Sequence, residues 1–130
     1  MGRINNFEGI EAWKIARMIN QEVWSLIKNS DLKFDHALKD QMNKASGSIM
    51  DNIAEGYERD GNREFVHFLS ISKASCGEVR SQLYRCLDRG YLDQKCFQRI
   101  YDLLIIESRK LKSFMNYLKT TDYNGTKFRK

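Results

Sequence analysis

Proline is absent from the 130-residue chain, and glycine occurs only eight times. Both residues interrupt helices, proline because it lacks a backbone N–H and clashes with the preceding turn. Alternating runs of β-branched residues, which are typical of strands, are also rare. The sequence therefore predicts long helices and an all-α fold. With 42% apolar and 12% aromatic residues, the chain fits a single domain that buries its own core.

Long hydrophobic runs are absent too. No stretch of about 18 uncharged apolar residues occurs, so we expect no transmembrane helix. Residues 1–7 lack the apolar segment of a signal peptide. Both absences favour a cytoplasmic protein without a membrane partner.

Metal-ligating residues are few and scattered. Cys76, Cys86 and Cys96 lie ten residues apart, without a C-x-x-C pair, and the two histidines, His36 and His67, have no cysteine or histidine neighbour. Cys76 and Cys86 fall on the apolar side of a helix, where a free cysteine acts as a small hydrophobe. We expect reduced structural thiols, an outward-facing His67, and no metal or other cofactor.

Recognisable catalytic motifs are missing as well. There is no H-E-x-x-H, no second E-x-x-H to form the pair of such motifs that a di-iron bundle uses, no glycine-rich phosphate loop and no G-x-S-x-G. Glu55, Glu78 and Glu107 are the carboxylates closest to expected packed surfaces, and two that converge could act as general acid and base. Carboxylates beside a core more often satisfy basic or backbone groups of a neighbouring helix. The sequence favours a non-enzymatic protein, with a carboxylate-based hydrolase as a much weaker alternative.

Apolar residues recur at intervals of three and four in four segments, which predicts four amphipathic helices. We place them at about 8–29, 35–55, 62–89 and 94–119. Asp35 and Asp93 are the expected N-caps of the second and fourth helices, and Asp60 or Asn62 that of the third. Gly90 is expected to end the third helix. Short turns between such helices predict an antiparallel up-down-up-down four-helix bundle, with residues 1–119 as one domain and the polar, basic residues 120–130 as a flexible tail.

The expected core faces of the last three helices follow from this spacing. The second helix contributes Leu38, Met42, Ala45, Ile49 and Ile53. The third contributes Phe65, Phe68, Leu69, Ser72, Cys76, Val79, Leu83, Cys86 and Leu87. The fourth contributes Phe97, Ile100, Leu104, Leu111, Phe114 and Leu118. Glu107 falls in the middle of this last stripe, and a carboxylate buried there needs a partner.

The first helix carries more apolar surface than one packed face requires. Its expected core stripe consists of Ile10, Trp13, Ala16, Val23, Trp24 and Ile27. Ile15, Met18 and Leu26 project from the other side. Such a surplus predicts a surface where copies of the chain associate.

The segment Ser48–Tyr57, S-I-M-D-N-I-A-E-G-Y, is expected to end the second helix. Gly56 falls where a left-handed residue just past a helix is wanted. Asn52 and Glu55 lie on a polar flank of this helix and are predicted to hydrogen-bond to adjacent helices or subunits. Gly47 in the helix interior costs about 1 kcal/mol relative to alanine, so we expect a packing reason for it.

The net charge of +5 is unevenly spread. Residues 73–130 hold thirteen Lys/Arg against six Asp/Glu, whereas residues 1–72 hold nine against eleven. The candidate nucleic-acid-binding residues are Lys73, Arg80, Tyr84, Arg109, Lys112 and Lys119. Basic side chains release counterions from a phosphate backbone, and an aromatic among them can stack on an unpaired base. The alternative is a basic surface that serves solubility alone.

Five motifs resemble the bacterial four helix bundle protein group, also called the 23S rRNA intervening-sequence protein or S23 family. They are F-x-x-I-x-A-W-K-x-A at Phe7–Ala16, S-I-x-x-N-I-A-E-G at Ser48–Gly56, E-F-x-x-F-L at Glu64–Leu69, S-x-x-E-x-x-x-Q-L at Ser75–Leu83 and G-Y-L at Gly90–Leu92. Together they cover almost the whole chain. The chain departs from the family at Met50, where a proline is common, and at Lys44, where the family has arginine.

The resemblance implies a small all-α bundle without catalytic activity, in which the matched residues Ser48, Asn52, Glu55, Gly56 and Glu78 are structural or lie at interfaces. The fold is similar to that of the accessory protein of diversity-generating retroelements, a pentamer that works with a reverse transcriptase and nucleic acid. A pentamer fits the surplus apolar positions Ile15, Met18, Ile71, Ile105 and Ile106.

The function predicted from the sequence is therefore that of a homo-oligomeric bundle that binds RNA or DNA through a basic face, as accessory to a nucleic-acid-processing partner. A protein-interaction or structural scaffold without nucleic acid is the alternative.

Overall fold

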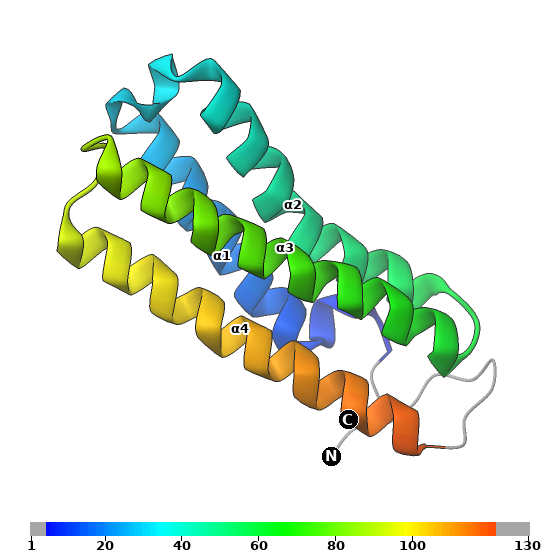
Figure 1. The fold of residues 1–130 in the computed structure, drawn as a ribbon. Coiled ribbons are helices and arrows are strands. Elements are labelled where there is room, and N and C mark those ends of the chain that lie inside the picture. Colours follow the sequence, from blue (N-terminus) through cyan, green and yellow to red (C-terminus); the bar gives the residue numbers. More distant parts are fainter. Residues whose placement is uncertain (1–4, 122–130) are drawn as a thin grey trace.

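The computed structural model of the protein describes residues 5–121, and every regular element in that range is helical. The long helices are α1 (Glu11–Lys28), α2 (His36–Glu58), α3 (Asn62–Asp88) and α4 (Gln94–Thr120) (Figure 1). Two short 3-10 turns, η1 (Phe7–Gly9) and η2 (Asp31–Phe34), flank α1. The predicted all-α fold is confirmed. None of the helices in residues 5–121 is both long enough and apolar enough to cross a membrane.

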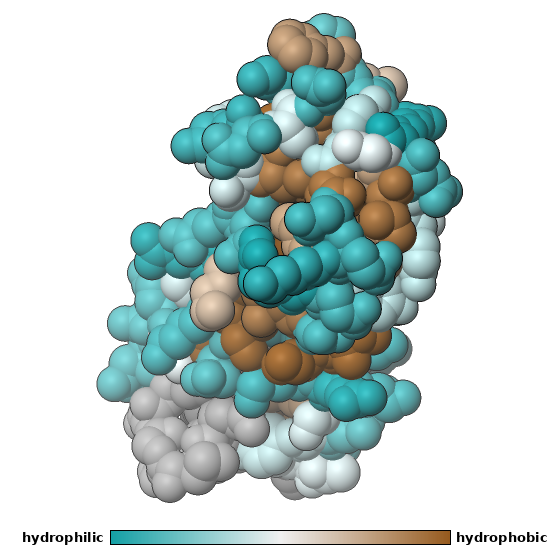
Figure 2. All heavy atoms as spheres, turned by 90° about the vertical axis from the view of Figure 1, so that its left-hand side faces the viewer, coloured by the Kyte–Doolittle hydropathy of each residue, from teal (hydrophilic) through white to brown (hydrophobic). Residues whose placement is uncertain are grey.

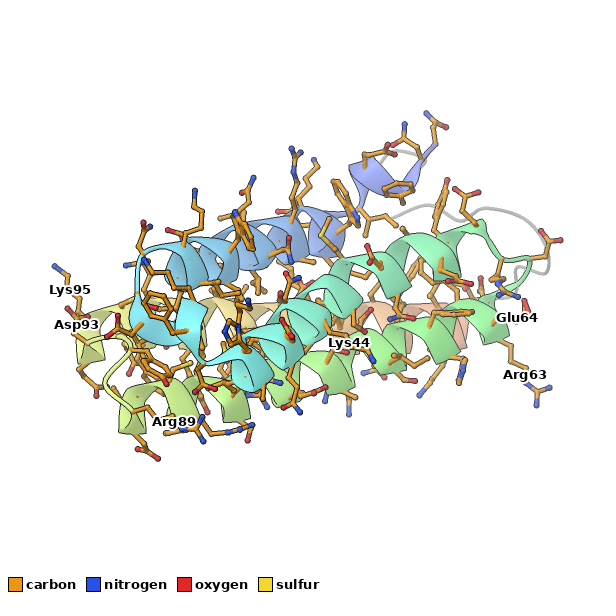
Figure 3. All side chains as sticks on the ribbon, turned by 90° about the horizontal axis from the view of Figure 1, so that it is seen from above. Lys44, Arg63, Glu64, Arg89, Asp93 and Lys95 are labelled. Carbon is orange, nitrogen blue, oxygen red and sulfur yellow. The ribbon has the colours of Figure 1, made fainter. Side chains whose placement is uncertain are left out.

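Contacts at the helix ends show that consecutive helices run in opposite directions. Arg89, just after α3, donates to the carboxylate of Asp35, just before α2, at 2.7 Å. Asn62 at the start of α3 donates to the carbonyl of Leu118 near the end of α4, at 3.1 Å. Figure 3 shows Arg63 and Arg89, from the two ends of α3, at opposite ends of the bundle.

The four helices close into a ring around one core. Each helix packs on its sequence neighbours, and α1 also packs on α4. The most extensive packing is that of α3 with α2 and α4, and α3 and α4 run side by side in Figure 1. The expected core residues of α2 and α4 are all buried. Seen from the end that carries η2 and the α3–α4 connection, the surface is largely hydrophilic, with apolar side chains visible in patches (Figure 2).

In α1 the predicted division between core and surface is wrong at three positions. Ile15 and Leu26, expected on the outer side, are buried, whereas Trp24, expected in the core, is 51% exposed. Trp13 is half-buried, and its ring lies 5.2 Å from that of Phe7. Because α1 is contacted by α2 on one side and α4 on the other, its buried face is wider and turned relative to the predicted stripe.

Three of the expected helix boundaries are confirmed. The carboxylates of Asp35 and Asp93 accept hydrogen bonds from backbone N–H groups three residues later and cap α2 and α4. Gly90 follows α3 with a φ of 75°. The N–H of Tyr91 then donates to the carbonyl of Cys86 at 2.9 Å, which is the long hydrogen bond of a Schellman motif.

The start of α3 differs from the prediction. Its N-cap is Gly61, with a φ of 89°, rather than Asp60 or Asn62. The Asn62 amide instead crosses to α4, where it donates to the Leu118 carbonyl and, at 2.6 Å, to the Thr121 hydroxyl. This side chain therefore ties α3 to the end of α4. The predicted tail at 120–130 lies outside the described residues from 122 onward.

The prediction that Gly56 lies just past the end of the second helix is wrong. Helix α2 continues through it to Glu58, and the glycines with positive φ among the described residues are Gly61 and Gly90. A Cβ atom on Gly56 would lie 2.7 Å from the Cβ of Phe68 and 2.8 Å from Cδ1 of Phe65. Gly56 is therefore required by the close approach of α3 to α2, because any side chain there would overlap the two phenylalanines.

Small polar residues join α2 and α3 further along. The Ser75 hydroxyl donates to the Ser48 hydroxyl at 2.9 Å, and the buried Ser72 hydroxyl donates to the Ile49 carbonyl at 2.8 Å. Gly47, in contrast, meets nothing closer to an added Cβ than the Asp51 carboxylate at 3.9 Å. Among the described residues, the packing reason expected for Gly47 is therefore absent.

Asn52 and Glu55 hydrogen-bond within α2 rather than to a neighbouring helix. The Asn52 amide donates to the Ser48 carbonyl and hydroxyl, both at 2.9 Å. Glu55 is exposed and accepts a hydrogen bond from Arg59 at 2.9 Å. The predicted contacts to adjacent helices are wrong, and contacts of these residues to another subunit stay a prediction.

Cys76 and Cys86 are free thiols buried in the core, as predicted. Burial raises the pKa of Cys76 to about 12 and that of Cys86 to about 11, so both stay protonated at neutral pH. His67 is exposed, also as predicted. Over residues 5–121, no three histidine, cysteine or acidic side chains are grouped so that they could hold a metal ion.

Candidate functional site

Basic side chains from two helices line a shallow hollow of about 450 Å³ between α3 and α4. Lys73 comes from α3, and Arg109 and Lys112 come from α4. Among the described residues that line the hollow, none is acidic. The structure thus brings together three of the six residues that were predicted to bind nucleic acid, and the hollow has a positive charge.

The helix geometry explains why these three meet. Arg109 and Lys112 lie three positions apart and share one face of α4. Since Asn62 pairs with Leu118 and the two helices are antiparallel, Lys73 reaches the part of α4 that precedes Leu118. The spacing in the sequence shows which face of each helix carries the basic residues. The pairing of α3 with α4 is what brings these residues side by side.

Three neutral polar residues complete the lining and were not predicted. Ser108, Ser113 and Asn116 surround Lys112 on α4. Hydroxyl and amide groups donate hydrogen bonds to phosphate oxygens as readily as to other acceptors. Their spacing was a usable signal, because Ser108 and Asn116 lie four residues from Lys112 and Ser113 lies four residues from Arg109, and residues four apart are neighbours on a helix surface.

Arg80 and Tyr84 lie further along α3, outside this hollow. Arg80 is half-buried, and its Nη1 has no hydrogen-bond partner among the described residues. Tyr84 is 50% exposed but packs on the rings of Phe97 and Tyr101, with centroids 4.9 and 5.9 Å away. Only part of its ring surface is therefore available to a stacking base. Lys119 is exposed in the last turn of α4 and does not line the hollow either.

The three carboxylates considered for catalysis do not share one environment. Glu55 and Glu78 are exposed, and Glu78 accepts a hydrogen bond from Gln82 of its own helix at 3.3 Å. Glu107 is 0% exposed, so it has no access to a solvent-filled site containing the other two. This arrangement gives no support to a general acid–base pair.

Glu107 also lacks the partner that was expected for it. Neither carboxylate oxygen has a hydrogen-bond partner among the described residues. Burial raises the pKa of Glu107 to about 8, against a small opposing effect of the Lys110 charge. The nearby Cys76 thiol is protonated as well. Glu107 is therefore a neutral carboxylic acid in the core at neutral pH.

A solved structure of another protein is similar to this chain over most of its length. It is the crystal structure of a protein of unknown function from the S23 ribosomal protein family of Bacteroides thetaiotaomicron, with a TM-score of 0.68 and 17% sequence identity. The likeness covers 80% of this chain and 94% of the other. At that identity it shows a common fold. A comparison with curated proteins finds no match.

The family comparison is more direct. The model of the family described as 23S rRNA-intervening sequence protein matches residues 8–113. The match includes α1, α2 and α3 in full and the part of α4 that carries Arg109 and Lys112. The chain therefore belongs to the 23S rRNA-intervening sequence protein family.

Proposed function

We propose that this protein is a non-enzymatic, homo-oligomeric helical bundle that binds RNA or DNA through the basic hollow between α3 and α4. The observation that carries the proposal is the convergence of Lys73, Arg109 and Lys112 on one hollow, with no acidic residue among the described lining residues. The association of the family with sequences that interrupt 23S rRNA supports RNA as the ligand.

The lining suits a phosphate backbone better than a base edge. Three positive side chains neutralise phosphates and release condensed counterions, which is a sequence-independent contribution. Ser108, Ser113 and Asn116 add neutral hydrogen-bonding groups that can position the backbone. The hollow is shallow, so we expect affinity for many sequences rather than readout of one.

Charge reversal in the hollow gives the first prediction. The double variant Lys73→Glu, Arg109→Glu should bind a mixed-sequence single-stranded probe at least about tenfold more weakly, because two phosphate contacts become repulsive. For the unaltered protein, three neutralised phosphates give a drop of about twentyfold between roughly 50 and 200 mM salt. Fluorescence anisotropy of a labelled probe measures both effects.

Lys44→Glu is the matched control, because Lys44 is an exposed residue of α2 and does not line the hollow between α3 and α4. This variant changes the net charge without touching the hollow, and it should retain most of the affinity. If the unaltered protein binds no probe at low salt, the proposed function is wrong. Equal losses in Lys44→Glu and in a single Lys73→Glu variant would show that net charge alone attracts the probe.

Association of the chain with itself is the second part of the proposal. Of the five surplus apolar positions, Ile15 is buried and Ile71 and Ile105 are half-buried. Met18 on α1 is 50% exposed and Ile106 on α4 is 45% exposed. These two remain as the anchors of an interface, and their exposure supports the proposed homo-oligomer.

A test of this interface follows. Light scattering at micromolar concentration should give a multiple of the 15.3 kDa chain mass, five chains if the assembly is the pentamer that the sequence resemblance implies. Met18→Lys together with Ile106→Lys should shift the mass toward a single chain, because charges would have to be buried in the interface. Circular dichroism checks that the variant is folded. A single-chain mass for the unaltered protein contradicts this part of the proposal.

A protein-interaction scaffold is the second candidate function. The same exposed Met18 and Ile106 favour it, since they could equally contact a different protein. Under the proposed function such a partner is a nucleic-acid-processing enzyme, for which the bundle acts as an accessory.

A further inference from the structure

A second hollow lies between α1, η2 and α2 and has a volume of about 540 Å³. Trp24 and Lys28 line it from α1, Lys33 from η2, and Lys39 and Asp40 from α2. In the ring of helices, the α1–α2 side lies opposite the α3–α4 side. This hollow is therefore separate from the one proposed above.

Trp24 provides an aromatic surface in this hollow. The side chain is 51% exposed, which is unusual for so large an apolar group. Trp13, on the same helix, packs against the ring of Phe7 and lies under the Arg17 guanidinium at 6.0 Å. Trp24 takes part in none of the ring contacts found within residues 5–121. Its indole is thus available for stacking.

The charges around the indole are mainly positive. Lys28, Lys33 and Lys39 line the hollow, and Asp40 is the one carboxylate among its described lining residues. Asp40 lies 3.9 Å from the Lys39 ammonium, so it offsets one lysine and leaves two positive charges in excess. An aromatic surface bordered by ammonium groups fits a flat, apolar group that carries an anion.

We propose that this hollow binds one unpaired nucleotide of a single-stranded nucleic acid, with its base stacked on Trp24 and its phosphates held by Lys28 and Lys33. The volume lies within the range of about 300–1,000 Å³ that is usual for small-ligand sites. Base–aromatic stacking tolerates any base, so the site selects unpaired strands over duplex rather than a sequence. An acidic peptide would use the lysines but would gain little from the indole.

The inference shares its ligand class with the proposed function but uses different residues. A strand that contacts both hollows would have to pass around the bundle, and two strands could occupy them at once. A finding that one hollow does not bind nucleic acid therefore does not decide whether the other hollow binds it.

Tryptophan fluorescence is a direct readout. The chain has two tryptophans, so a Trp13→Phe variant leaves Trp24 as its only tryptophan, which can be excited selectively over the tyrosines. Titration with a short oligo(dT) should quench Trp24 emission in a saturable way, because a base stacked on the excited indole accepts an electron from it and so provides a non-radiative route of decay. Lys28→Glu together with Lys33→Glu should weaken this binding at least about tenfold, since both phosphate contacts become repulsive.

Substitution of Trp24 distinguishes the contribution of base stacking to the binding affinity from that of the lysine charges. In the Lys73→Glu, Arg109→Glu background, where the α3–α4 hollow no longer competes, Trp24→Leu should weaken binding of a labelled oligo(dT) at least about fivefold, whereas Trp24→Phe should retain most of the affinity. Because the side chain is half-exposed, both variants are expected to fold, and thermal melting checks this. Equal affinities for the leucine and phenylalanine variants would overturn the stacking assignment.

Two further measurements distinguish this site from the α3–α4 hollow and from a peptide site. In the Lys73→Glu, Arg109→Glu background, quenching of Trp24 should persist. If the probe binds but Trp24 emission is unchanged, the inference is wrong while the proposed function stands. If polyglutamate quenches Trp24 as strongly as oligo(dT) at equal ionic strength, the hollow binds acidic protein segments and the nucleotide assignment is overturned.

Discussion

Replacing Glu107 by glutamine is expected to make the protein more stable at alkaline pH, by about 3–5 kcal/mol near pH 9. The side chain is fully buried, and neither of its oxygens has a hydrogen-bond partner among the described residues. An ionised carboxylate in that position loses its hydration and gains no counter-charge in contact. Glutamine has nearly the same shape and never ionises, so it removes this destabilising effect.

The direction of the pH dependence follows from the raised pKa of Glu107. Burial raises this pKa from 4.5 to about 8. Below 4.5 the carboxyl is protonated in both the folded and the unfolded chain, so it contributes no pH dependence there. Between 4.5 and about 8 the folded chain alone keeps the proton, and stability falls as the pH rises. At about 1.4 kcal/mol per pH unit, the full difference approaches 5 kcal/mol above the folded pKa.

Urea denaturation of both proteins at several pH values checks the prediction. The difference in unfolding free energy between variant and unaltered protein should be small near pH 5 and grow toward pH 9, flattening beyond the folded pKa of about 8. Glu58→Gln is the control, because Glu58 is exposed at the end of α2 and its replacement should give a small, nearly constant difference. Parallel stability curves for Glu107→Gln and the unaltered protein would mean that Glu107 is not a buried, unpaired acid.

The fold could be predicted because three of the helices have one clearly apolar face. In α2 and α4 each expected core residue is buried, although α4 also carries the half-buried Ile105 and the exposed Ile106 outside that face. In α1 apolar residues surround much of the helix. Periodicity alone therefore could not decide whether Trp24 or Leu26 faces the core. The choice depends on how α2 and α4 pack against α1, and these contacts are not local in sequence.

The candidate site was predicted in part for a similar reason. The sequence indicated which face of each helix carries Lys73, Arg109 and Lys112, and the pairing of α3 with α4 decided that these three meet while Arg80 and Tyr84 do not. The hollow beside Trp24 could not be predicted, because the helical spacing of Trp24 predicts a buried side chain. Two glycines five residues apart, Gly56 and Gly61, both fit a helix end, and only the positive φ of Gly61 identifies the one that begins the next helix.

Gly56→Ala is expected to destabilise the protein by about 2–3 kcal/mol, although alanine is the better helix former by about 1 kcal/mol. The added Cβ would lie 2.7 Å from the Cβ of Phe68 and 2.8 Å from Cδ1 of Phe65. A Cβ atom moves only with its backbone, so rotation of the Phe68 side chain cannot relieve that overlap. Helices α2 and α3 must separate instead, and their interface is among the two most extensive in the bundle.

Gly47→Ala on the same helix is the matched control for this effect. An added Cβ at Gly47 has the Asp51 carboxylate at 3.9 Å as its nearest neighbour, which is ordinary contact. Only the helix propensity then changes, and this variant should gain about 0.5–1 kcal/mol. Thermal and urea unfolding of the two variants should therefore move in opposite directions. If both gain stability, then α2 and α3 are not in close contact at Gly56. If Gly47→Ala loses stability only at concentrations where the chain self-associates, then Gly47 lies in the proposed contact between subunits, because mass action couples an interface to folding.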